Sequence, residues 1–394
     1  LEVQNMQQKE TAIEDRKEFA KIIVTGCMVQ NHSKEIQRLC PEVDYLLGSG
    51  DVESILKAIE AENPGSHISS ARSYIEAGEV PRQLSTPKQY AYLKIAEGCR
   101  KHCSYCIIPD IKGPLKSKPI ERVVKEFKIL LDQGVKEIIL IAQDLGDWGR
   151  DLKYSKGEGL PALLRELSKI EGKYWLRLLY LYPDEITDEV ISIIKNDPRI
   201  CPYLDMPIQH INNTILKSMR RTTSRDQIID SIIKLRKEIP DICIRTSFIV
   251  GFPGETFEQF LELESFIQEY PLDNVGIFAY SPEEGSHAIS LENQVKEEDK
   301  NLRQQRLAKI QQDLIEKINS RYIGRTLEVM VEGYHPDSEF LMKGRHQGQA
   351  PEIDGEIIIN DCQAVTAFGE WYNVEITDCT GYDLIGKALA PSTI

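Results

Sequence analysis

Between residues 90 and 280 the hydrophobic positions follow two alternating periodicities. Short apolar runs predict strands at residues 90–95, 137–142, 175–180, 203–207, 242–250 and 275–280. Apolar residues spaced three or four positions apart predict helices at residues 120–132, 161–170, 188–195, 225–238 and 258–269. Strands that alternate with helices predict a parallel α/β sheet, with functional residues at the carboxyl ends of its strands.

Composition restricts the class of protein. The chain has 394 residues, which is long for one core and suggests two or three domains. Its net charge of −14 argues against general binding of nucleic acid backbones, although a local basic patch would escape that count. No apolar run reaches the roughly 18 residues of a membrane span, and the first residues do not form a signal peptide. The nine scattered cysteines favour reduced thiols in a cytoplasmic enzyme over a disulfide framework.

Three cysteines directly follow the first predicted strand. Cys99, Cys103 and Cys106 have the spacing C-x3-C-x2-C. A closed zinc site needs four ligands, whereas three thiolates on an iron–sulfur cube leave one iron without a protein ligand. Spacing alone also permits a zinc knuckle completed by His102 or a remote ligand, or three unrelated buried thiols.

The cysteine spacing resembles that of the radical S-adenosylmethionine (SAM) enzymes. The resemblance implies a [4Fe-4S] cluster on Cys99, Cys103 and Cys106, with SAM chelating the open iron. It also implies that the backbone of Tyr105 lies near the adenine. Six strand–helix units are too few for a closed eight-unit barrel, and they fit the open, partial (β/α)6 barrel of this family.

Other strand ends carry residues that match the SAM site of the family. The resemblance assigns the SAM amino group to Gln143, the ribose and carboxylate to Gln209 and Arg221, and the adenosine to residues 246–256, which include Ser247 and Gly251. Arginine suits a carboxylate because its guanidinium forms two parallel hydrogen bonds. The alternatives are a plain strand-end turn for Gln143 and a solvated helix-end position for Arg221. Because the family leaves the chemistry to its cofactors, we expect no general acid or base.

The two ends of the chain resemble the methylthiotransferases within this family. Residues 22–30 match the third cysteine motif of their N-terminal domain, which implies that Cys27 helps to ligate a second [4Fe-4S] cluster. The first two motifs have no counterpart, so we expect an N-terminally truncated chain, and we interpret Cys40 as an ordinary buried thiol. The expected domains are residues 1–84, a partial N-terminal α/β methylthiotransferase domain with a linker; residues 85–320, the radical SAM domain; and residues 321–394, an all-β TRAM barrel.

The C-terminal region suggests which branch of the methylthiotransferases the chain resembles. Residues 325–394 hold twelve acidic and four basic residues, a net charge of −8, and include Glu352 and Asp354 in the segment 349–355. Such a surface repels RNA and suits a basic protein. Segment 349–355 also resembles the RimO type, which modifies an aspartate of a small-subunit ribosomal protein.

The resemblance implies a radical mechanism that needs partners. A deoxyadenosyl radical would take hydrogen from the aspartate β-carbon, and the second cluster would deliver the methylthio sulfur. The expected partners are the basic ribosomal protein or the small ribosomal subunit, together with a one-electron donor. The alternatives are a tRNA adenosine methylthiotransferase and a non-catalytic iron–sulfur or zinc protein that binds ribosomes.

Overall fold

The computed structural model describes residues 21–70, 75 and 83–392, and these divide into two compact units. The first unit comprises Leu1–Val80 and Ile108–Pro114, and the second comprises Pro81–Ile107 and Leu115–Ile394. Within the described ranges, no helix is both long and apolar enough to cross a membrane.

The first unit is a small α/β structure. Its parallel sheet has the order β1 (Ile23–Thr25), β2 (Tyr45–Leu47) and β3 (Gly65–His67). Its helices are α2 (Cys27–Leu39), α3 (Ile55–Glu60) and α4 (Ile108–Lys112), with a 3-10 turn at Val52–Ser54. Parallel neighbours require helical crossovers, which α2 and α3 supply. The expected N-terminal α/β domain is therefore present over the part of the chain that the structure describes. Cys40 ends α2 and is partly buried, not fully buried as expected.

The second unit contains the predicted six-stranded parallel sheet. The strands are β4 (Tyr90–Lys94), β7 (Glu137–Ile141), β8 (Trp175–Leu178), β9 (Ile200–Asp205), β10 (Cys243–Val250) and β11 (Asn274–Ala279). Their spatial order is β11-β10-β9-β8-β7-β4, so each strand lies beside its predecessor in the sequence. A sheet wound in sequence order that stops at six strands is an open partial barrel, as the sequence predicted. A separate antiparallel pair, β5 (Ala96–Glu97) and β6 (Lys116–Ser117), flanks the cysteine loop.

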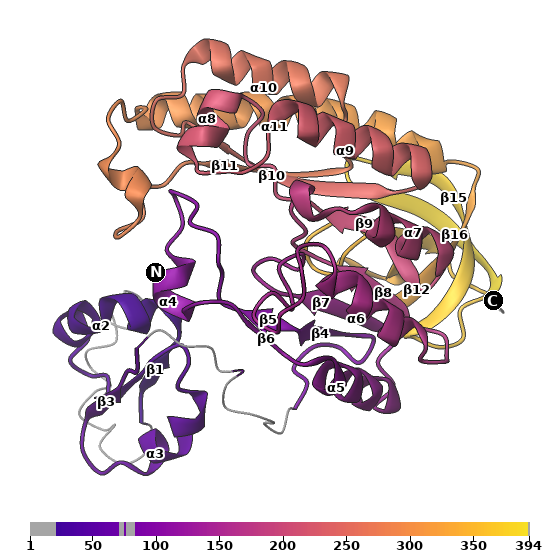
Figure 1. The fold of residues 1–394 in the computed structure, drawn as a ribbon. Helices are drawn as coiled ribbons and strands as arrows, with labels where there is room; N and C mark the ends of the chain where they lie inside the picture. The colour runs from indigo at the N-terminus through magenta and orange to yellow at the C-terminus, as the bar shows by residue number, and fades with distance from the viewer. Residues whose placement is uncertain (1–20, 71–74, 76–82, 393–394) are drawn as a thin grey trace. The chain divides into compact units, whose positions relative to one another are not determined.

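Helices cover one face of this sheet (Figure 1). They are α5 (Ile120–Asp132), α6 (Gly159–Ser168), α7 (Asp188–Asn196), α8 (Asn213–Ser218), α9 (Arg225–Glu238), α10 (Phe257–Glu269) and α11 (Glu297–Asn319), with 3-10 turns at Pro183–Glu185, His287–Ser290 and Ser320–Tyr322. Reciprocal capping boxes start α9 at Ser224 and α10 at Thr256. Alternate strand residues such as Ile138 and Leu176 pack beneath these helices in the main core.

A closed five-stranded barrel packs against the other face of the sheet. Its strands are β12 (Thr326–His335), β13 (Ser338–Arg345), β14 (Ile357–Asp361), β15 (Glu370–Thr380) and β16 (Asp383–Pro391), in the order β12-β13-β14-β16-β15. Ile139, Trp175 and Tyr203 of the sheet form one buried cluster with Met330 and Trp371 of the barrel. The inner face of the half barrel is thus partly filled by the C-terminal barrel.

Buried charges join the sheet to the barrel. Glu137 accepts hydrogen bonds from Arg177 at 2.6 Å and from Arg345 of the barrel at 2.7 Å. The carboxylate is fully buried, and the two guanidiniums have exposed fractions of 0% and 3%. Burial alone would raise the pKa of Glu137, but the two guanidiniums hold it below its ordinary value. Removing any one of these charges would leave another buried charge without its partner, so the group holds the sheet and the barrel in one arrangement.

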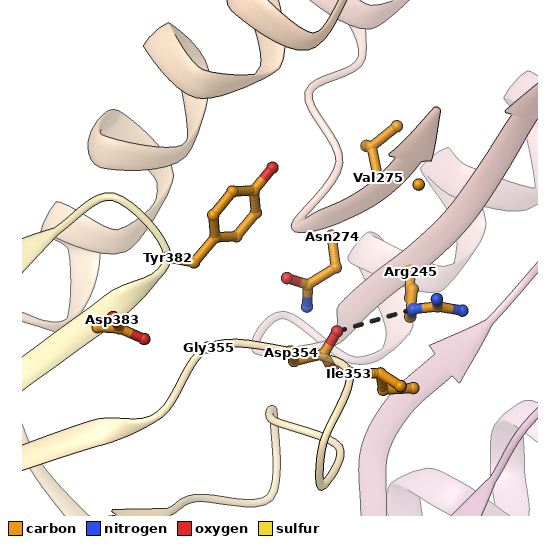
Figure 2. Close-up of a pocket in the computed structure, with 9 residues that line it drawn as sticks. Arg245, Asn274, Val275, Ile353, Asp354, Gly355, Tyr382 and Asp383 are labelled. Carbon is orange, nitrogen blue, oxygen red and sulfur yellow. Dashed lines mark ion pairs between the residues drawn. The ribbon is translucent and has the colours of Figure 1, made fainter. Parts of the chain in front are cut away.

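The loop that joins β13 to β14 corrects one expectation from the sequence. Glu352 and Asp354 were expected on the acidic surface of the barrel; Glu352 is exposed there, whereas the side chain of Asp354 is buried against the sheet. Tyr90 donates its hydroxyl hydrogen to Glu352 at 2.6 Å, and Tyr203 does the same to Asp354 at 2.7 Å. The Asp354 side chain is only 1% exposed and also faces Arg245 (Figure 2). The charge of Asp354 therefore lies inside the protein, and a count of the charged residues in the sequence does not reveal this.

Candidate active site

The cysteine loop is held at the carboxyl edge of the sheet by backbone hydrogen bonds. Ser104 donates from its backbone to Met219 O at 3.1 Å and from its hydroxyl to Ser218 O at 2.8 Å. Its carbonyl accepts the Ala288 N–H at 2.7 Å, and Cys106 N–H bonds Cys103 O at 3.1 Å. Residues distant in sequence therefore fix the position of the three thiols.

Two N–H groups point at the sulfur atoms of this loop. The Lys101 backbone N–H donates to Cys99 Sγ at 3.4 Å, and Arg221 Nη1 donates to Cys103 Sγ at 3.8 Å. Burial raises the pKa of Cys99 to about 11, so a free thiol there stays protonated at neutral pH. A metal would stabilise the thiolate, because a coordinating thiol loses its proton. The donor set therefore fits a bound metal group better than free thiols.

The three thiols of the loop do not all lie within 4.8 Å of one another. In the described part of the chain, three potential ligand atoms lie within 4.8 Å of one another at Asp144, Asp147 and Glu185, and the cysteines form no such group. Thiolates on a single zinc ion, each about 2.3 Å from the metal, would satisfy that spacing. His102 is exposed on the loop surface.

Arg221 is directed at the cysteine loop. Its guanidinium lies 4.0 Å from the ring centroid of Tyr182, and Nη2 donates to Pro207 O. Its Nε is buried and has no hydrogen-bond partner in the structure. An arginine that is 8% exposed is no solvated helix-end residue, so the alternative interpretation from the sequence is excluded. An unsatisfied buried donor beside the thiols suits an anionic group such as a carboxylate.

Gln209 and Ser247 lie side by side at adjacent strand ends. Gln209 N–H donates to Ser247 O, and Gln209 O accepts the Ile249 N–H, both at 2.8 Å. Gln209 has a φ of 73°, a left-handed conformation that is uncommon for a residue with a side chain. Backbone strain of this kind concentrates at binding sites, where the surrounding structure maintains it.

Gly251 occupies a tight turn after β10. Its φ is 71°, and an added Cβ would lie 2.3 Å from Lys300 Cγ of α11. Its N–H donates to Glu255 Oε2 at 2.7 Å, and Arg303 of α11 binds the other oxygen of Glu255 at 2.9 Å. Glycine is required here by the turn and by the approach of Lys300. The sharp turn expected from the sequence is therefore present, and the expected approach of a cofactor at Gly251 stays a prediction.

Tyr105 and Gln143 complete the set of predicted cofactor residues. Tyr105 packs against a buried cluster that includes Met219, Phe252 and Tyr280, which joins the cysteine loop to the glycine turn. Burial raises its pKa, and the nearby Cys103 adds to that effect. Gln143 follows β7, and its buried Oε1 accepts no hydrogen bond. A ligand N–H, such as an amino group, would satisfy this oxygen.

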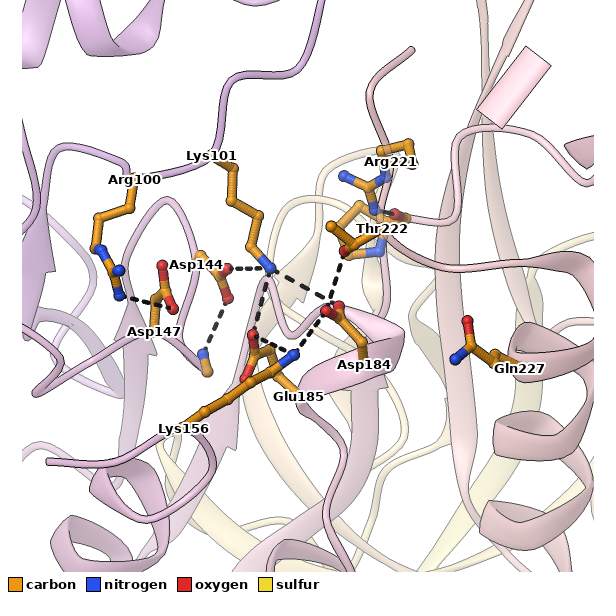
Figure 3. Close-up of polar contacts among 12 residues, drawn as sticks. Arg100, Lys101, Asp144, Asp147, Lys156, Asp184, Glu185, Arg221, Thr222 and Gln227 are labelled. Carbon is orange, nitrogen blue, oxygen red and sulfur yellow. Dashed lines mark hydrogen bonds and ion pairs between the residues drawn. The ribbon is translucent and has the colours of Figure 1, made fainter. Parts of the chain in front are cut away.

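A charged network beneath the loop was not predicted from the sequence. Lys101 Nζ lies 3.1 Å from Asp144, 3.7 Å from Asp184 and 3.4 Å from Glu185 (Figure 3). Although burial alone lowers the pKa of Lys101, these three carboxylates raise it above its ordinary value. The sequence shows a lysine between the cysteines and an acidic pair after β8. These residues are far apart in the sequence, so the sequence did not indicate that they are in contact.

Asp144 has the most perturbed carboxyl group of this network. Burial raises its pKa to about 7, Lys101 opposes that rise, and Asp147 and Glu185 add to it. Its side chain is 2% exposed, and the acidic neighbours outnumber the lysines that compensate them. The floor of the site therefore holds more acidic groups than lysines, and the protonation of Asp144 is sensitive to any added charge.

Cys27 is not part of this arrangement. It is the first residue of α2, it is exposed, and it belongs to the first unit. The remaining predicted residues all belong to the second unit. All nine cysteines lie in the described ranges and are free thiols.

Thiols at the carboxyl edge of a six-stranded parallel sheet, with a closed barrel behind it, define the radical SAM class of enzymes carrying a TRAM domain. The radical SAM superfamily model matches residues 93–267, and the TRAM domain model matches residues 323–389. The fold is also similar to the cobalamin-dependent SAM radical enzyme OxsB, at a TM-score of 0.50 and 13% identity, over 78% of this chain and 46% of that one.

Within this class the chain belongs to the RimO family, the ribosomal protein uS12 methylthiotransferases. It is 61% identical to the RimO of Protochlamydia amoebophila over 98% of this chain and 81% of that protein. The RimO of Bdellovibrio bacteriovorus is 43% identical, over 93% of this chain and 81% of its own length. The RimO of Clostridium novyi is 46% identical over the same shares. The tRNA-modifying and non-catalytic alternatives therefore give way to the RimO interpretation.

Proposed function

We propose that this chain inserts a methylthio group at the β-carbon of an aspartate in ribosomal protein uS12. The observation that carries the proposal is the three-thiol loop beneath Arg221, in a chain that belongs to the RimO family. A bound [4Fe-4S] cluster with SAM supplies the carbon radical that attacks a C–H bond too strong for acid–base chemistry. The chain's residues bind these groups, orient them and exclude water.

Three thiolates would hold the cluster. Cys99, Cys103 and Cys106 present three sulfur atoms, and the two N–H donors from Lys101 and Arg221 disperse their negative charge. The fixed hydrogen bonds of Ser104 keep the loop in place before any cofactor binds. Such preorganisation reduces the ordering that binding would otherwise require.

The residues around this loop would bind SAM. Arg221 offers its unpartnered Nε to the carboxylate, and Gln143 offers its unpartnered oxygen to the amino group. Gln209 and Ser247 line the ribose side, while Tyr105 and the turn at Gly251 border the adenosine. The buried cluster that joins Tyr105 to Phe252 supports this assignment, because it links the loop to the turn.

Cys27 would contribute to the second [4Fe-4S] cluster. It begins α2 with an exposed side chain, and it lies near the first turn of the helix, where backbone N–H groups favour a thiolate. Several thiolates are needed for one cluster, so Cys27 acts with other ligands. The methylthio sulfur would come from this second site.

The outer surface of the barrel favours a basic protein as the partner. Asp337, Glu339, Asp361, Glu370 and Asp378 are exposed. Arg345 is withdrawn into the junction, so it does not offset these charges. An acidic surface steers a basic ribosomal protein and repels tRNA. A one-electron donor and a reducing compartment such as the cytoplasm complete the requirements, since clusters need reduced thiols.

Two measurements test the proposal. Reduction of the reconstituted chain in the presence of SAM should release deoxyadenosine, which a non-catalytic iron–sulfur protein would not do. Mass spectrometry of uS12 and of tRNA, after incubation with the complete enzyme, should then find the methylthio group on uS12. Modification of tRNA with uS12 unchanged would overturn the assignment of the substrate.

A further inference from the structure

A cavity of about 390 Å³ lies where the C-terminal barrel meets the edge of the six-stranded sheet. Arg245 of β10 and Asn274 of the edge strand β11 form one wall, and Asp354, Tyr382 and Asp383 of the barrel form the other (Figure 2). Both walls belong to the second unit. The cavity is separate from the thiol loop and from the predicted cofactor residues.

Negative charge predominates in and behind this cavity. Arg245 is the cation among its lining residues, and it already donates to Asp205 at 3.0 Å. Its Nε lies 3.7 Å from Asp354 Oδ1, which is an ion-pair distance but too long for a hydrogen bond. Asp383 adds a further carboxylate on the barrel wall, so the lining residues hold two carboxylates and one guanidinium. The uncompensated charge favours a cationic ligand.

One oxygen of Asp354 lacks a hydrogen-bond donor. Oδ2 accepts hydrogen bonds from Tyr203 at 2.7 Å and from Ala350 N–H at 2.8 Å, which fix the carboxylate in place. Oδ1 is buried and accepts no hydrogen bond. Buried carboxylate oxygens without a donor are unfavourable, so this atom marks a position where a ligand N–H would be bound. Burial raises the pKa of Asp354, and a bound cation would oppose that effect.

We propose that this cavity binds a basic side chain, a guanidinium or an ammonium, of the substrate protein. The inference rests on the proposed function, because it takes the substrate to be a basic ribosomal protein. Asp354 and Asp383 would pair with the cation, and the ring of Tyr382 offers a face for it.

The position of the cavity gives such a contact a role in the reaction. Arg245 and Ser247 are two residues apart on the same face of β10, about 7 Å along the strand. A side chain anchored in the cavity would therefore hold the neighbouring substrate residues close to the SAM-binding edge. Anchoring of this kind positions a reacting carbon without contributing to the bond-breaking step.

The test uses the full chain and three small peptides. Acetyl-Gly-Arg-Gly-amide and its lysine counterpart supply the cation, and the citrulline counterpart is a neutral isostere of the arginine peptide. Saturation-transfer NMR should show that the two basic peptides bind at least about tenfold more tightly than the citrulline peptide. Equal affinity for the arginine and citrulline peptides would overturn the proposal.

Three variants and a matched control locate the binding site. Asp354→Asn and Asp383→Asn remove charge but keep an oxygen acceptor, and each should weaken the arginine peptide about tenfold. Asn274→Lys places a cation inside the cavity and should abolish binding without removing a hydrogen bond that fixes the fold. Asp230→Asn, on the exposed face of α9, should leave binding unchanged. Wild-type affinity in Asp383→Asn and Asn274→Lys would overturn the proposal, even if Asp354→Asn failed to fold.

Failure of this inference is distinguishable from failure of the proposed function. If the wild-type chain binds neither basic peptide, the cavity is not a site for a basic side chain, whatever the substrate is. If the complete enzyme does not modify uS12, the function is wrong, whatever the peptides do.

Discussion

Replacing Glu137 by glutamine should destabilise the junction between the sheet and the barrel. The carboxylate is fully buried and is the acidic partner of Arg177, which also donates a hydrogen bond to the Gln347 carbonyl of the barrel at 2.8 Å. Removing one member of a buried charged group costs about 3–5 kcal/mol, because the remaining charge is left uncompensated. Glutamine keeps one acceptor oxygen, so we expect about 3 kcal/mol.

The matched control is Glu332→Gln. Glu332 binds the same Arg345 at 2.7 Å, but its side chain is 17% exposed and water can replace it. Its loss should cost no more than about 1 kcal/mol. Arg177→Met added to Glu137→Gln should recover part of the loss, since the unpaired cation is then absent.

Urea unfolding followed by tryptophan fluorescence suits this comparison. The ring centroids of Trp175 and Trp371 are 6.1 Å apart across the junction, so their emission reports its opening. The effect of Glu137→Gln should persist in 1 M salt, because buried pairs are poorly screened. A loss below about 1 kcal/mol, or equal to that of Glu332→Gln, would refute the reasoning.

Further predictions concern the site and its dependence on pH. Cys103→Ala should remove most iron absorbance and all deoxyadenosine release; full activity would contradict the radical SAM assignment. Arg221→Gln should weaken SAM binding, measured by calorimetry, by roughly 1.5–3 kcal/mol if it holds the carboxylate. Gly251→Ala should lower the melting temperature, because of its φ of 71° and the approach of Lys300. Burial and nearby arginines lower the pKa of His346 from 6.5 to about 3, so the folded state binds fewer protons than the unfolded state between these values. Stability should therefore fall as pH drops below 6.5, by up to about 1.4 kcal/mol per pH unit, and urea titrations of His346→Gln should show a shallower slope.

The sequence predicted the sheet well because the strands carry their own signals. Both faces of the sheet are covered, so β7 is a nearly continuous apolar run that no helix pattern mimics. The boundaries of α5 and α9 were predicted exactly where the structure has them, and α9 begins at a capping serine. Helix α11 was not predicted, because its buried face includes Lys300, Arg303 and other polar residues.

The sequence predicted site residues only where they belong to a recognisable motif. The cysteine spacing pointed to the thiol loop, and the family resemblance pointed to Arg221, which lies beside Cys103 in the segment after α8. The lysine and carboxylate network was missed since Lys101, Asp144 and Glu185 are distant in the sequence. The role of Asp354 was misjudged for a related reason: a charge count does not reveal which side chains are buried.

The loop that joins β13 to β14 also limits how such proteins can exchange parts. Residues 349–355 resemble the RimO type, and this loop seats itself among Tyr90, Tyr203 and Arg245 of the sheet. A barrel taken from a relative would need a loop that matches these three partners, so barrel and sheet must vary in concert. Chimeric enzymes should tolerate grafts on the outer hairpin of β12 and β13 far better than replacement of the whole barrel.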